Sequence, residues 1–109
     1  MATWRTKACL EFGFEPARYS YRRGKVELFR DLVEMARRAA NANDTVAMKQ
    51  IAEYVSWAAA QKSPELDSAV DLAFLLPLFQ DAELLATLRP YFSESLVLGK
   101  WQVLMEASA

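Results

Sequence analysis

Few side chains in this sequence could do chemistry. The 109 residues include no histidine and a single cysteine, Cys9, so a Ser–His or Cys–His nucleophile cannot form and the commonest metal ligand is missing. Asp67 and Asp71 are spaced one helical turn apart and could share acid–base work. No Glu-x-x-His motif, glycine-rich phosphate loop or zinc-ligand spacing accompanies them. We therefore expect a protein that is not an enzyme and that uses no metal and no cofactor.

Acidic residues dominate the second half of the chain. Residues 65–109 contain seven acids and two bases, a formal balance of −5. One interpretation is that these acids form a surface that binds a basic protein partner, with Trp57 as a candidate aromatic anchor. The acids proposed for this surface are Asp67, Asp71, Asp81 and Glu83. On a helical wheel Phe74 and Leu78 continue the face of Asp67 and Asp71. The other interpretation is that the acids are solvated while Phe74 and Leu78 fill the core.

A basic and aromatic segment lies at residues 18–25, and it provides a rival binding surface. Its members are Arg18, Tyr19, Tyr21, Arg22, Arg23 and Lys25. Arginine beside tyrosine can contact phosphates and stack on bases, which would make the chain a small regulatory or nucleic-acid-associated domain. The same composition is common at protein interfaces, and the tyrosines could also pack under the helices. Because the formal net charge is −1, we do not expect nucleic acid to be the main partner.

The elements that must position these residues are helices. Apolar residues at helical spacing predict helices over about 25–40, 45–61, 65–76, 82–88 and 94–106. Asp44, Ser63, Asp81 and Ser93 stand where N-caps are expected, and Asn41 and Asn43 suit a left-handed exit. The stretch 65–76 is apolar on nearly every side, which indicates an enclosed helix. Pro77 is expected to end or kink it.

The predicted fold is therefore all-α. We expect a compact bundle of four or five helices around a buried central helix at about 65–76, arranged as a simple bundle or as HEAT-like helical pairs. One domain spans 1–109, with an irregular or partly helical segment at 1–24 and a helical core at 25–106. A self-associating adaptor would also fit this architecture.

The composition places the chain among globular proteins, with 53 % hydrophobic and 25 % charged residues. No apolar run is long enough to predict a membrane-spanning helix. The first residues lack the apolar core of a secretory signal. We therefore expect a cytoplasmic protein without a membrane partner.

Four segments together resemble a group of small all-helical bacterial domains of unknown function, some of which are immunity proteins of polymorphic toxin systems. The segments are KVELFRDLVEMARRA, MKQIAEYVSWAA, DLAFLLPLFQDAEL and LRPYFSESLVLGKW. The resemblance covers about three-quarters of the chain and is one of helix lengths and apolar spacing, so no functional residue is carried across. It implies a non-enzymatic protein that binds and neutralises a cognate bacterial toxin.

Overall fold

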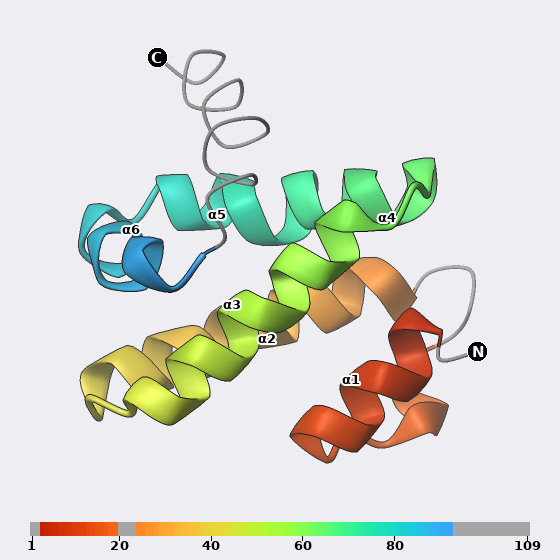
Figure 1. The fold of residues 1–109 in the computed structure, drawn as a ribbon, viewed down its shortest axis with the longest axis horizontal. Coiled ribbons are helices and arrows are strands. Elements are labelled where there is room, and N and C mark those ends of the chain that lie inside the picture. The colour runs from red at the N-terminus through yellow and green to blue at the C-terminus, as the bar shows by residue number, and fades with distance from the viewer. Residues whose placement is uncertain (1–2, 20–23, 93–109) are drawn as a thin grey trace.

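The structure, a computed structural model, describes residues 3–19 and 24–92 and is all-α over these ranges (Figure 1). Its helices are α1 (Trp4–Phe12), α2 (Gly24–Asn41), α3 (Thr45–Ala60), α4 (Pro64–Ala69), α5 (Leu76–Phe79) and α6 (Ala82–Leu88). A π-helical segment, Val70–Leu75, joins α4 to α5, and short 3-10 turns stand at Pro16–Arg18 and Arg89–Tyr91. The predicted helix at 94–106 and its cap Ser93 lie outside the described residues.

The helices begin where short polar side chains can cap them. Asp44, Ser63 and Asp81 each accept a hydrogen bond from the backbone N–H three residues later, as predicted. Thr3 caps α1 in the same way. Asn43 adopts a φ of 52° after α2, which is the left-handed exit that the sequence indicates. These local signals explain why the predicted starts of α3 and α6 and the predicted end of α2 agree with the structure.

The central helix is longer than predicted, because Pro77 does not end it. Instead α4, the π-helical segment and α5 run on as one rod, Pro64–Phe79, which we call the α4–α5 rod. Pro77 has no N–H, and in a regular α-helix its ring would clash with the carbonyl of Ala73. In the structure the N–H of Leu76 bonds the carbonyl of Asp71, five residues earlier. We attribute the continuation to this wider turn, which makes room for the proline ring.

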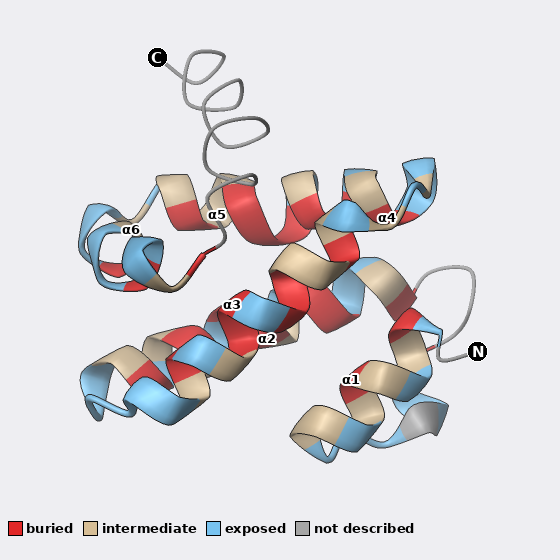
Figure 2. Cartoon of the chain, in the orientation of Figure 1, coloured by how far each residue is buried: buried red, intermediate tan, exposed pale blue. Residues whose placement is uncertain are grey.

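The rod lies across α2 and α3, with α6 at one end, while α1 covers the far side of the α2–α3 pair (Figure 1). Figure 2 shows the buried residues on the surfaces where these helices meet. Seven rod residues are buried, which confirms a buried central helix: Leu66, Ala69, Val70, Ala73, Phe74, Leu75 and Leu78. No helix in the described part of the chain is both long and apolar enough to cross a membrane.

The described residues at 3–19 are partly helical, and specific contacts join them to the core. The buried hydroxyl of Tyr54 donates to the carbonyl of Trp4 at 2.7 Å, which fixes α1 on α3. Gly24 opens α2 where a Cβ would lie 2.6 Å from the carbonyl carbon of Tyr19. Only glycine permits so close an approach.

Candidate functional site

Tyr19 and Tyr54, whose pKa values are raised, have a structural role. Burial raises the pKa of Tyr54 above its ordinary value, and burial together with the hydrogen bond to Asp31 does the same for Tyr19. The Tyr19 hydroxyl donates to Asp31 at 2.6 Å. Within the described residues, no three histidine, cysteine or acidic side chains are grouped to hold a metal ion. The features left for a candidate site are the shape and the charge of the surface.

Asp67 and Asp71 stand one turn apart on the α4–α5 rod, and both are half-buried. One carboxylate oxygen of Asp71 is buried. Phe74 and Leu78 are fully buried, so they fill the core, as the second interpretation of the sequence holds. The helix face that carries the two acids therefore packs into the core where Phe74 and Leu78 lie.

Asp81 and Glu83 lie elsewhere, on the wall of a cleft between the C-terminal part of α2 and the start of α6. The cleft has a volume of about 490 Å³. Its polar lining comes from both helices, and its apolar lining is Ala40, Leu84 and Ala86. We call it the α2–α6 cleft. It is larger than the cleft of about 350 Å³ that Asp67 lines beside the loop between α3 and α4.

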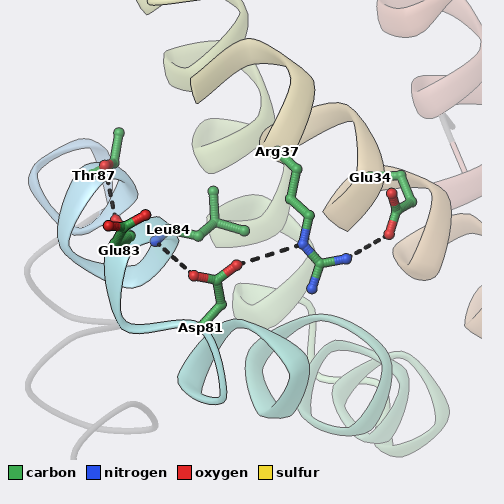
Figure 3. Close-up of polar contacts among 6 residues, drawn as sticks. All are labelled: Glu34, Arg37, Asp81, Glu83, Leu84 and Thr87. Atoms are coloured by element: carbon green, nitrogen blue, oxygen red, sulfur yellow. Dashed lines mark hydrogen bonds and ion pairs between the residues drawn. The ribbon is translucent and has the colours of Figure 1, made fainter. Parts of the chain in front are cut away.

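A short chain of polar contacts shapes this cleft (Figure 3). One carboxylate oxygen of Asp81 accepts the Leu84 N–H at 3.2 Å, and the other lies 3.6 Å from Nε of Arg37. Arg37 also donates from Nη1 to Glu34 at 2.5 Å. The Glu83 side chain is exposed at the rim. Asp81 is thus held by a backbone donor, whereas Glu83 is available to a partner.

The charge around this cleft and along the rod is mostly negative. Residues 63–88 contain five acids and no lysine or arginine. In the lining of the α2–α6 cleft, Arg37 supplies one positive charge against Asp81 and Glu83. A basic surface would meet a complementary potential here.

Trp57, the predicted anchor, lies on α3 beside α1. Its half-buried ring packs 5.8 Å from Tyr54, and the ammonium of Lys7 lies 5.2 Å from its centroid. It does not line the α2–α6 cleft. The structure therefore does not bring Trp57 together with Asp81 and Glu83.

The described members of the basic segment take part in the fold. Arg18 lies 3.1 Å from a carboxylate oxygen of Asp31, and Tyr19 is buried. The Lys25 side chain is 13 % exposed, 3.3 Å from Glu65 and 5.2 Å from the ring centroid of Trp4. Tyr21, Arg22 and Arg23 lie outside the described residues.

Two residues of the surface are missed by the sequence analysis. Arg37 enters the cleft through packing between α2 and α6, for which no local signal exists. Leu72 is 64 % exposed, although its apolar neighbours in the sequence suggest burial. Its exposure could have been predicted from its position two residues before Phe74, because residues two apart lie on nearly opposite sides of a helix.

Comparisons with known protein families, with curated proteins and with solved structures give no match.

Proposed function

We propose that this chain is a non-enzymatic protein-binding domain, most specifically an immunity-type protein that neutralises a cognate toxin in the bacterial cytoplasm. The observation that carries the binding role is the stretch at 63–88, whose charged residues are all acidic, with Asp81 and Glu83 on the wall of an open cleft. The narrower assignment to toxin immunity is supported by the resemblance in helix lengths and apolar spacing.

Binding of this kind needs surface complementarity and no chemistry of its own. A stable interface covers about 800 Å² on each partner, which is roughly one eighth of the 6702 Å² of accessible surface. Complementary charge speeds encounter and rejects acidic competitors. A toxin would be neutralised because its functional surface is covered.

The described part of the basic segment favours a protein over a nucleic acid as partner. Tyr19 and Lys25 are largely enclosed, and Arg18 is paired with Asp31. The cations that bind a phosphate backbone must be available to replace its counterions. Arg18 and Lys25 are instead engaged in ion pairs within the fold.

Affinity capture from lysate of the native bacterium, with mass spectrometry of the eluate, tests this proposal. The immobilised baits are the unaltered chain, the double variant Asp81→Asn/Glu83→Lys, and a matched control, Glu53→Lys, which alters an exposed acid on α3. Asparagine is chosen at 81 because it caps a helix about as well as aspartate.

We expect one stoichiometric protein on the unaltered chain and on Glu53→Lys, and much less on the double variant. Co-expression should then relieve the toxicity of that protein. Recovery of nucleic acid alone, lost after nuclease treatment, would overturn the proposal. A captured protein without toxicity would retain the binding role and remove the immunity assignment.

A further inference from the structure

The α2–α6 cleft has the size of a ligand pocket and two chemically different walls. Its volume of about 490 Å³ lies within the range of about 300–1,000 Å³ that is usual for pockets that hold small ligands. One wall comes from the last turns of α2, with Arg37 and Asn41, and the other from α6 and its cap, with Asp81, Glu83 and Thr87. The donors and acceptors that the fold leaves available on these walls indicate the chemistry of an occupant.

The positively charged and hydroxyl donors on the walls are engaged within the fold (Figure 3). Arg37 lies between two carboxylates: its Nε is 3.6 Å from Asp81, and its Nη1 donates to Glu34 at 2.5 Å. The Thr87 hydroxyl donates to the main-chain carbonyl of Glu83 at 2.8 Å. The positive charge of this cleft is therefore already balanced by acids of the same chain.

The groups that remain are mainly acceptors. Within residues 3–19 and 24–92, no hydrogen bond or ion pair joins the carboxylate of Glu83 or the side chain of Asn41 to another group. The Thr87 hydroxyl has its hydrogen on a carbonyl, so its oxygen can only accept from a ligand. The C-terminal end of α2, which carries partial negative charge, also reaches the cleft at Asn41. A complementary occupant donates hydrogen bonds and carries positive charge.

We propose that the α2–α6 cleft receives an arginine side chain of the protein partner. A guanidinium offers five donors in a planar fork and can meet acceptors on both walls, whereas an ammonium is a compact point charge. The aliphatic stem of the arginine packs on Ala40 and Ala86, which belong to the apolar lining. The inference rests on the proposed function, because it names the group with which a protein partner enters this cleft.

Arg37 controls how strongly the cleft attracts this arginine, because the two guanidinium groups compete for Asp81. The contact of Arg37 with Asp81 is longer than its contact with Glu34, so Arg37 can leave Asp81 and keep one carboxylate partner. Removal of the Arg37 charge makes Asp81 available to the entering side chain. Arg37→Gln should therefore strengthen binding, whereas Glu83→Gln should weaken it.

A titration followed by NMR tests this site with a defined probe. The probe is a five-residue peptide with blocked ends, uncharged residues and one central arginine. The control peptide carries citrulline, which replaces the guanidinium by a neutral group of nearly the same shape. The proteins are the full chain, Glu83→Gln, Arg37→Gln and the matched control Glu53→Gln, which neutralises an exposed acid on α3 that does not line the cleft.

The expected result is a set of amide shifts at residues 37–41 and 81–87 that saturates at millimolar arginine peptide. Affinity should fall about threefold to fivefold in Glu83→Gln, rise about twofold in Arg37→Gln and stay within about 1.5-fold in Glu53→Gln. Equal affinity for the citrulline peptide, unchanged affinity in Glu83→Gln, or shifts confined to other residues would overturn the proposal.

The titration uses no lysate, so its failure is distinguishable from failure of the capture experiment. If a protein is captured but the arginine peptide does not bind, the inserted arginine is rejected and the proposed function stands. If the peptide binds but the chain captures no protein, the cleft is assigned to a free guanidinium compound, which overturns the inference that a protein partner supplies the arginine.

Discussion

Asp81 has two roles that two substitutions can separate. One carboxylate oxygen caps α6 by accepting the Leu84 N–H, and the other faces the guanidinium of Arg37 (Figure 3). Replacement by asparagine keeps an acceptor for the cap and removes the charge. Replacement by alanine removes both.

The cap should dominate the energetic effect. Loss of an aspartate cap to alanine costs about 1 kcal/mol. The ion pair is weak, since its side chains are 38 % and 41 % exposed and its atoms lie 3.6 Å apart, and pairs of this kind contribute at most several tenths of a kcal/mol. We expect Asp81→Asn to lower the free energy of unfolding by less than about 0.5 kcal/mol, and Asp81→Ala by about 1–1.5 kcal/mol.

Urea unfolding followed by far-ultraviolet circular dichroism measures both values. Glu83→Gln is the matched control, because it removes an exposed charge from the same helix. The reasoning is refuted if Asp81→Asn is as destabilised as Asp81→Ala, because the ion pair would then carry the energy assigned to the cap.

Three other changes have defined outcomes. Tyr54→Phe removes the hydrogen bond to the Trp4 carbonyl and should cost about 1–2 kcal/mol in thermal unfolding, with hydrogen exchange rising most in α1; unchanged exchange there would contradict the anchoring role. Gly24→Ala forces a Cβ against the Tyr19 backbone and should cost more than about 1 kcal/mol by urea unfolding, whereas a neutral effect would show that the contact relaxes freely. Burial is the main cause that raises the pKa values of Tyr54 and Tyr19 in the folded state. The stability that the two protonated hydroxyls contribute is therefore fully present below the ordinary tyrosine pKa of about 10, and it is lost as the pH rises through the folded-state pKa values. An alkaline series of urea unfolding curves measures this, and a flat profile would argue against it.

The features that could be predicted are those encoded within a few residues. Asp44, Ser63 and Asp81 cap helices because each needs only the N–H three residues ahead. The apolar spacing that predicts α2 and α3 is likewise local. Burial of the central helix follows from its apolar surroundings on nearly every side.

The candidate site depends on packing between distant segments, and there the sequence is less informative. The contact of Arg37 with Asp81 joins two helices across 44 positions of the chain. Lys25 reaches Trp4 and Glu65 only because α1, α2 and α4 converge. The sequence predicts that Pro77 ends or kinks the helix, yet the helix continues past Pro77 after the π-helical segment. Helix propensity alone does not predict whether a helix ends at a proline or continues past it through a wider turn.

The central claim is that the acids of residues 63–88, with Asp81 and Glu83 on the wall of the α2–α6 cleft, bind a protein. The association rate of the captured partner at several salt concentrations tests this claim most directly. For the unaltered chain the rate should fall as salt rises, because charge steers the encounter. Glu83→Lys should slow association by about tenfold at low salt, while Glu53→Lys should stay within about twofold. Equal, salt-independent rates for all three proteins would contradict the claim.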